Sequence, residues 1–189
     1  MNLLEKTSSI AIKRKVLIEM PKTLLPKFDN PLFLADFLQS CLDDPSNTLD
    51  LQIYALKALF LLLQNHGLDY ANYYKKLYSL LLPQQVDHHV ISVFTSVDHA
   101  TKQRFLRVLD LSLRSPTLPS KLVASFVKRL ARVLVAEGVV VGVNDTMFVL
   151  SLIANLIKRH PRAARLIHRK KTSLSMGRRM ATDPFLHNE

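Results

Sequence analysis

The segment from Ser120 to Ala136, SKLVASFVKRLARVLVA, decides the fold class. Its apolar residues recur at intervals of three and four, which is typical of one face of an amphipathic α-helix. They are Leu122, Val123, Phe126, Val127, Leu130 and Leu134. Pro119 precedes the segment and Gly138 follows it, as expected at helix boundaries. We therefore expect a helix over 120–136 that buries one face and presents basic side chains on the other.

The same helical period recurs along most of the chain, with Pro and Gly between the periodic segments. A helix over residues 49–66 carries Ile53, Leu56, Phe60 and Leu63 on one face and ends at Gly67. Further helices are expected over residues 3–19, 22–28, 31–42, 70–82, 99–114, 146–159 and 161–169. In the helix over 146–159 we expect Asn144 or Asp145 as the N-cap and a buried face of Phe148, Leu152, Ile153, Leu156 and Ile157. Residues 84–97 fit a strand, a loop or a short helix.

These segments predict an all-α fold, an antiparallel helical stack of about eight or nine helices that forms a HEAT-like or irregular α-solenoid. A compact irregular bundle is the alternative, since no exact repeat is present. The low count of 4 Gly in 189 residues agrees with a helical chain. We expect a weak N-terminal helix over 1–20, the helical domain over 21–169, and a basic tail over 170–189 that is disordered on its own.

Several classes of protein are disfavoured by composition. A lone cysteine, Cys41, cannot form an internal disulfide, so a reducing compartment is expected. Charged residues interrupt the first apolar run after Met1, so no targeting peptide is expected. The most apolar stretch, 49–63, contains charges and is shorter than the ~20 residues that a bilayer needs, so we expect no membrane association.

The sequence offers no convincing catalytic or metal site. Three histidines and two aspartates cluster in one region, at Asp87, His88, His89, Asp98 and His99. Their spacing does not bring ligands to one face of a helix, so a polar loop explains them better than a metal centre. Glycine-rich phosphate-binding loops are absent. We expect no enzyme, no cofactor and no small-molecule substrate.

Positive charge is concentrated in the second half of the chain. The whole chain has 26 Lys or Arg and 15 Asp or Glu, a net charge of +11, but residues 101–181 alone have 17 basic and 3 acidic residues. This imbalance predicts an anionic partner, with RNA phosphates first, acidic protein second and anionic lipid third. The candidate binding residues are Lys121, Lys128, Arg129, Arg132, Lys158, Arg159, Arg162, Arg165, Arg169, Lys170 and Lys171. Lys158 and Arg159 have a simpler alternative role, since cations at the C-terminal end of a helix interact favourably with its dipole. A nuclear or nucleolar localisation signal is a second interpretation of residues 158–171.

Four tyrosines recur at helical spacing over residues 70–78, namely Tyr70, Tyr73, Tyr74 and Tyr78. Such rings line a core or a partner groove more often than they stack on bases. We therefore assign Tyr73, Tyr74 and Tyr78 to packing and to contact with a partner helix.

Several blocks in order along residues 21–169 resemble a known family. They are PLFLADFL (31–38), LFLLL (59–63), YYKKLYSLL (73–81), RFLRVLDL (104–111), LPSKLVASFVKRLAR (118–132), NLIKRHP (155–161) and LIHR (166–169). Together they resemble the CCAAT-binding-factor domain family of nucleolar complex proteins. Members of that family are usually longer and carry a Trp-containing block after this domain, so the absence of Trp predicts a short or truncated form.

This resemblance implies a non-catalytic scaffold of the nucleolus that acts in small-subunit ribosome biogenesis. The implied partners are pre-ribosomal RNA, small-subunit precursor particles and a nucleolar protein 14-like protein. Two alternatives stay open, a protein-interaction module without RNA contact and a role in large-subunit biogenesis as in sister members. A DNA-binding role ranks lower, because no recognition motif is present.

Overall fold

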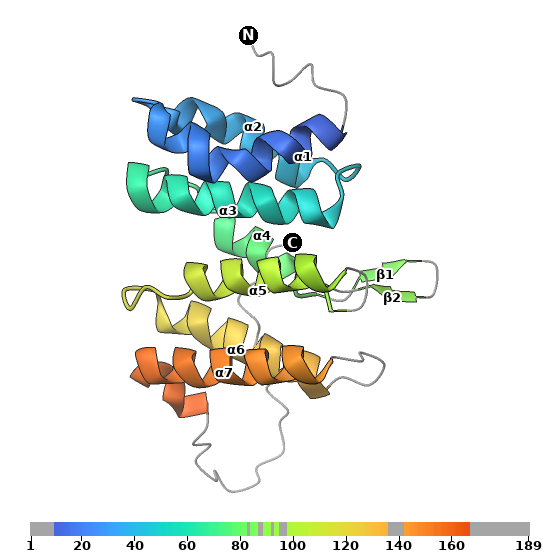
Figure 1. Ribbon diagram of the computed structural model, residues 1–189. Helices are drawn as coiled ribbons and strands as arrows, with labels where there is room; N and C mark the ends of the chain where they lie inside the picture. The colour runs from blue at the N-terminus through green and yellow to red at the C-terminus, as the bar shows by residue number, and fades with distance from the viewer. Residues whose placement is uncertain are drawn as a thin grey trace, which may run out of the picture. The chain divides into compact units, whose positions relative to one another are not determined.

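The structure is a computed structural model that describes residues 10–82, 84–86, 89–91, 93–94, 98–135 and 142–166. Within these residues the chain is a succession of helices (Figure 1), which confirms the all-α prediction. The α-helices are α1 (Ile10–Glu19), α2 (Ala35–Asp43), α3 (Leu49–His66), α4 (Tyr73–Ser79), α5 (His99–Ser112), α6 (Ser120–Val135) and α7 (Val143–Arg159). Short 3₁₀ or π segments cover Met20–Leu24, Leu25–Lys27, Pro31–Leu34 and Pro161–Leu166. No helix among the described residues combines the length and apolar character needed to cross a bilayer.

One strand pair interrupts the helices. Strand β1 (Gln84–Val86) pairs with β2 (His89–Ile91) in antiparallel register, with Gln84 opposite Ile91 and Val86 opposite His89. For these residues the strand alternative of the 84–97 segment is the one observed. Val86, Val90 and Ile91 supply the β-branched character that favours an extended backbone.

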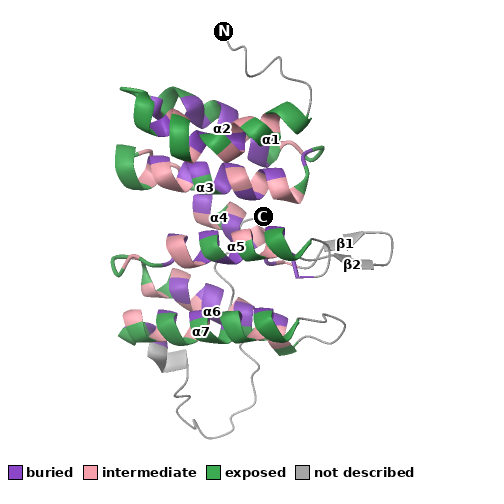
Figure 2. Cartoon of the chain, in the orientation of Figure 1, coloured by how far each residue is buried: buried purple, intermediate pink, exposed green. Residues whose placement is uncertain are grey.

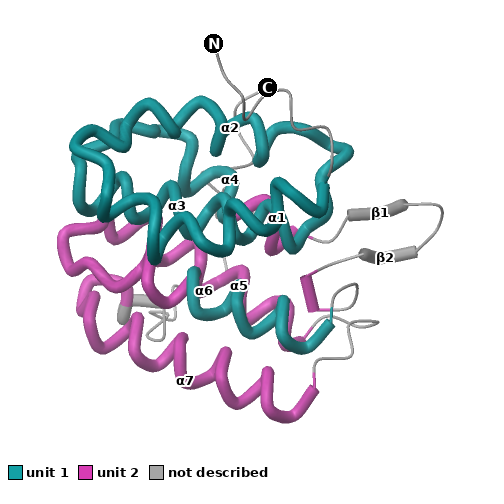
Figure 3. The backbone as a smooth tube through the Cα atoms, turned by 45° about the horizontal axis from the view of Figure 1, so that its top comes forward, with its two compact units in different colours: residues 1–77, 97–108 teal, residues 78–96, 109–189 magenta. Residues whose placement is uncertain are grey.

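The chain divides into two compact units (Figure 3). Unit 1 comprises residues 1–77 and 97–108, and unit 2 comprises residues 78–96 and 109–189. The division passes through α4 and α5, so each unit contains segments that are distant in sequence. The predicted tail, 170–189, lies outside the described residues, and the solenoid arrangement stays a prediction.

Helix α3 forms the centre of unit 1, where it contacts both α1 and α2 (Figure 2). Because it is covered from two sides, its buried face is wider than a single stripe. The buried residues are Leu51, Ile53, Ala55, Leu56, Ala58, Leu59 and Leu62. Phe60 and Leu63, which the period placed on the buried face, are only half-buried. Gly67 ends the helix in the left-handed region, with φ of 65°, and its N–H donates to the Leu62 carbonyl, as the sequence predicted.

A polar network around Asp50 connects helices within unit 1. The Asp50 carboxylate accepts hydrogen bonds from Arg14 Nε at 2.7 Å and from Thr101 Oγ1 at 3.0 Å. Its Oδ1 also lies 3.3 Å from Arg104 Nη2, and the Arg104 guanidinium stacks over the Tyr54 ring. The network joins α1, α3 and the first part of α5, and it pairs Arg14 and Arg104 with one carboxylate.

Helices α6 and α7 pack together in unit 2. The buried residues of α6 include Val123, Phe126, Val127 and Leu130, as predicted, whereas Leu122 and Leu134 are half-buried. The predicted buried face of α7 was wrong at Phe148, which is 39% exposed. The helix begins at Val143 after Gly142, three residues earlier than expected, so neither Asn144 nor Asp145 is its N-cap. Its buried stripe runs through Asp145, Val149, Leu152 and Leu156.

Candidate nucleic-acid interface

The described part of unit 2 carries far more basic than acidic residues. It contains nine Lys or Arg and two Asp, a balance of +7. The basic residues are Arg114, Lys121, Lys128, Arg129, Arg132, Lys158, Arg159, Arg162 and Arg165. The described part of unit 1 is closer to balance, with eleven basic and eight acidic residues. The excess charge predicted from the sequence therefore belongs mainly to one compact unit.

Three basic residues form a stripe along α6. Lys121, Lys128 and Arg132 are seven and four residues apart, so at 3.6 residues per turn they share one side of the helix. Lys121 and Arg132 are exposed and Lys128 is half-buried, while the opposite side of α6 faces the core. Helix α6 thus presents two of the predicted binding residues, Lys121 and Arg132, as exposed cations on the same side.

Two of the predicted binding residues contact other parts of unit 2. Arg129 Nε donates a hydrogen bond of 3.1 Å to the carbonyl of Leu81, just after α4. Arg159 Nη1 donates to Asp110 Oδ1 at 3.1 Å, and Arg114 Nη2 donates to Asp110 Oδ2 at 2.9 Å. These bonds connect segments 48 and 49 residues apart in sequence and give both arginines a structural role. Their predicted contact with RNA stays a prediction.

The Asp110 pairing should make unit 2 sensitive to acid. Burial alone would raise the pKa of Asp110, but hydrogen bonds and charges from Arg114 and Arg159 lower it below its ordinary value. A depressed folded-state pKa stabilises the fold above the unfolded pKa of about 3.9, and this contribution is lost as pH falls through the folded value. We expect Asp110→Asn to lower the free energy of unfolding at neutral pH by about 1 kcal/mol and to flatten its decrease below pH ~4.

Urea unfolding of the unmodified chain and of Asp110→Asn, at neutral and at acidic pH, measures this effect. Asp29→Asn is the matched control, because Asp29 is exposed and should leave the pH profile unchanged. If Asp110→Asn retains the full acid sensitivity of the unmodified chain, the pairing does not contribute to stability.

The end of α7 provides further cations. Lys158 and Arg162 are exposed, and neither pairs with an acidic side chain among the described residues. Arg165 lies in the segment Pro161–Leu166. Three other predicted residues, Arg169, Lys170 and Lys171, lie outside the described part of the chain.

Two of the three tyrosines assigned to packing and partner contact lie inside the protein. Tyr73 and Tyr78 are buried, and their rings contact Phe60 and Phe126, respectively, at centroid distances of 5.9 and 5.3 Å. Burial confirms the packing interpretation for these two residues and leaves neither ring on the surface. Tyr74 is half-buried, so contact with a partner helix stays a prediction for that residue.

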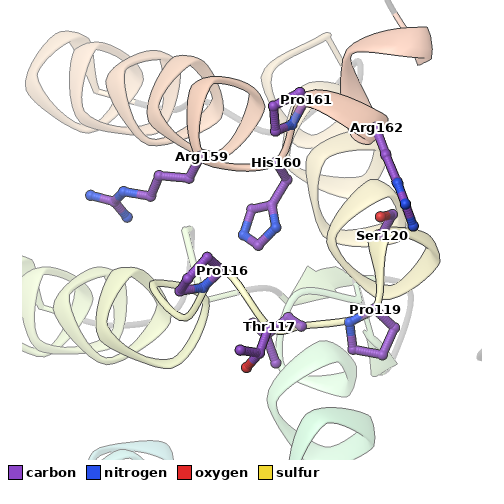
Figure 4. A pocket seen from close by; sticks show the side chains of 9 residues that line it. Pro116, Thr117, Pro119, Ser120, Arg159, His160, Pro161 and Arg162 are labelled. Carbon is purple, nitrogen blue, oxygen red and sulfur yellow. The ribbon is translucent and has the colours of Figure 1, made fainter.

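A pocket of about 370 Å³ lies within unit 2, between the connection 116–120 and the end of α7 (Figure 4). Its lining residues are Pro116, Thr117, Leu118, Pro119, Ser120, Arg159, His160, Pro161 and Arg162. His160 is only 4% exposed, and its Nε2 has no hydrogen-bond partner within the described structure. The backbone of His160 is fully engaged, because its N–H donates to Leu156 and its carbonyl accepts from Ala163.

Sequence reasoning missed His160 and Ser120 as site residues. The Pro residues of both segments indicated chain breaks, but no sequence pattern shows that two breaks about 40 residues apart share a pocket. For metal binding, the described residues contain no group of three His, Cys, Asp or Glu side chains close enough to hold an ion. Asp87 and His88 of the histidine cluster lie outside those residues.

Comparison with known proteins identifies the family. Residues 52–186 match the sequence profile of the CBF/Mak21 family. The chain belongs to the CBF/Mak21 family. The matched region includes α6, α7 and the whole pocket, so the candidate interface lies within the CBF/Mak21 domain.

Three relatives show the extent of the similarity. The chain is 34% identical over 190 residues to nucleolar complex protein 4 homolog B of Xenopus laevis, covering 100% of this chain and 32% of that protein. It is 34% identical over 177 residues to nucleolar complex protein 4 homolog of Homo sapiens, covering 93% and 30%. It is 34% identical over 158 residues to NUCLEOLAR COMPLEX ASSOCIATED 4 of Arabidopsis thaliana, covering 84% and 24%.

The chain thus spans a third or less of the length of these CBF/Mak21 relatives. The family membership confirms the resemblance that the sequence blocks indicated. The names of the relatives refer to nucleolar complexes, in agreement with the nucleolar localisation that the resemblance implied.

Proposed function

We propose that this chain is a non-catalytic helical part of a nucleolar ribosome-assembly factor. Membership of the CBF/Mak21 family and similarity to nucleolar complex protein 4 homologues support this role. By the same resemblance, the chain acts in small-subunit assembly on pre-ribosomal RNA, together with a nucleolar protein 14-like partner. Its own contribution is to hold other components in place rather than to carry out chemistry.

The charge imbalance of unit 2 is the observation that supports RNA contact. Lys121, Arg132, Lys158 and Arg162 are exposed, and none has an acidic partner in the described part of the chain. Both aspartates of the described unit 2 are unavailable to offset them, since Asp110 binds two arginines and Asp145 is buried. Cations of this kind bind RNA through backbone phosphates, which gives affinity without base specificity.

A second candidate function rests on exposed apolar residues of α7. Val143, Met147, Phe148 and Leu150 are 79%, 60%, 39% and 49% exposed, respectively. Val143, Met147 and Leu150 are four and three residues apart and so share one side of the helix, and exposed apolar side chains gathered on one side are typical of protein contacts. It favours a protein-interaction module, with or without RNA.

Copurification with a tagged chain tests the proposed function. We expect the tagged chain to recover small-subunit precursor RNA from cell extract, and nuclease treatment to release part of the associated protein. Recovery of large-subunit precursors would assign the chain to a different assembly pathway. A complex that survives nuclease treatment intact and contains no RNA would favour the protein-interaction module.

A further inference from the structure

We propose that the pocket between 116–120 and 159–162 binds one phosphate of an RNA backbone. This inference rests on the proposed function and gives its RNA contact a specific site. It depends on the lining residues, the start of α6 and the unpartnered imidazole of His160, which are independent features of unit 2.

The lining of the pocket suits an anion. None of its nine residues is acidic, whereas two are arginines, one is a histidine and two carry hydroxyl groups. The Arg159 side chain extends away from His160 (Figure 4), and its guanidinium binds Asp110. Arg162 is exposed and extends beside Ser120. The pocket therefore offers one available guanidinium together with neutral donors.

The N-terminus of α6 strengthens this preference for an anion. The Val123 N–H donates to the Pro119 carbonyl, which makes Pro119 the residue that precedes the first helical turn. Proline has no side-chain acceptor to cap the helix, and the first turn contains no acidic residue. The first N–H groups of a helix lack intrahelical acceptors and, with the helix dipole, favour a negative group at that end.

His160 is the second feature that indicates a ligand. Its imidazole points toward the 116–119 connection (Figure 4), and its Nε2 is buried without a hydrogen-bond partner in the described structure. A buried polar atom without a partner is costly, so native proteins normally satisfy such atoms. A phosphate oxygen that reaches the ring from the pocket would accept a hydrogen bond from Nε2–H and satisfy this atom.

Charge and size favour a phosphodiester over a phosphorylated protein. A phosphoserine carries about −1.5 to −2 at neutral pH and is usually met by a cluster of arginines. Here Arg159 pairs with Asp110, which also pairs with Arg114, so Arg162 is the one lining arginine without an acidic partner among the described residues, fewer than the cluster that a phosphoserine usually meets. Lys121 and Lys158 adjoin the two lining segments in sequence and supply cations for neighbouring phosphates of a strand. The volume of about 370 Å³ lies within the range of about 300–1,000 Å³ found for ligand pockets.

Nuclear magnetic resonance of the full chain tests the pocket directly. The ring nitrogen signals of His160 are followed during titration with inorganic phosphate and with a short single-stranded RNA. We expect both to shift these signals in the unmodified chain. Arg162→Gln should abolish the shift and lower RNA affinity by about tenfold, the effect of losing one charge-assisted contact. Lys27→Gln removes the same charge from an exposed position in unit 1, outside the proposed binding residues, and should leave the His160 shift intact.

The outcomes separate this inference from the proposed function. RNA binding without any response of His160 would overturn the pocket and leave the proposed RNA contact standing. Failure of the unmodified chain to bind RNA would overturn both. A phosphoserine peptide that shifts His160 where RNA does not would overturn the inference in favour of a phosphoprotein ligand. Since Arg162 is exposed, thermal unfolding of Arg162→Gln should match that of the unmodified chain.

Discussion

Replacing Phe126 with Ala should lower the free energy of unfolding by about 3–5 kcal/mol. Phe126 is fully buried in α6, and its ring meets that of Tyr78 edge to face at a centroid distance of 5.3 Å. The substitution removes apolar surface from the core and leaves a cavity, and it also removes the aromatic pair, which contributes about 0.5–1.5 kcal/mol beyond burial. Denaturant unfolding monitored by circular dichroism measures the loss.

Phe148→Ala is the matched control in the same unit. Phe148 is 39% exposed on α7 and contacts no other aromatic ring within the described residues, so its truncation should change the free energy of unfolding by less than about 1 kcal/mol. If Phe126→Ala and Phe148→Ala lower the free energy of unfolding equally, the burial of Phe126 and the exposure of Phe148 are wrong. A larger loss of stability for Phe148→Ala would instead show that Phe148 is buried, as the sequence period predicted for α7.

Reversing the charge of Lys121, Arg132 and Lys158 together should lower RNA affinity by about 100-fold or more at ~0.1 M salt. Each side chain is exposed in unit 2, and each contact with a phosphate releases a condensed counterion, which makes binding favourable. The triple Glu variant removes three such contacts and adds repulsion from the phosphates. Fluorescence anisotropy with a labelled single-stranded RNA measures the change.

The matched control places the same change of net charge in unit 1. Lys15, Lys22 and Lys27 are exposed, so the triple Glu variant at these positions changes the net charge of the chain by the same amount and alters no core side chain. It should lower the affinity far less than the unit 2 variant. Equal losses would show that RNA senses only the total charge of the chain, and the assignment to unit 2 would fail.

The bounds of two helices could be predicted well from the sequence. The helix expected over 49–66 is observed as Leu49–His66 with the expected Gly67 cap, and the helix expected over 120–136 is observed as Ser120–Val135. Helix α7 was predicted less well because apolar residues occur on several of its sides, including Val149, Leu150 and Leu152. A helix that is apolar on several sides does not reveal which side faces the core.

The candidate interface could be predicted only in part. Exposure of Lys121 and Arg132 followed from the amphipathic pattern of their helix. By contrast, the partners of Arg129 and Arg159 lie 48 and 49 residues away, so no local pattern could indicate that these arginines stabilise the fold. The pocket was missed for the same reason, since the chain brings its two lining segments together only after folding.

The salt dependence of RNA affinity tests the central claim most directly. The full chain is titrated with a short single-stranded RNA at salt concentrations from about 50 to about 200 mM. Four exposed cations of unit 2, at about −0.7 per phosphate on a single strand, predict a slope of about −3 for log affinity against log salt. A slope near zero would contradict phosphate recognition by these residues.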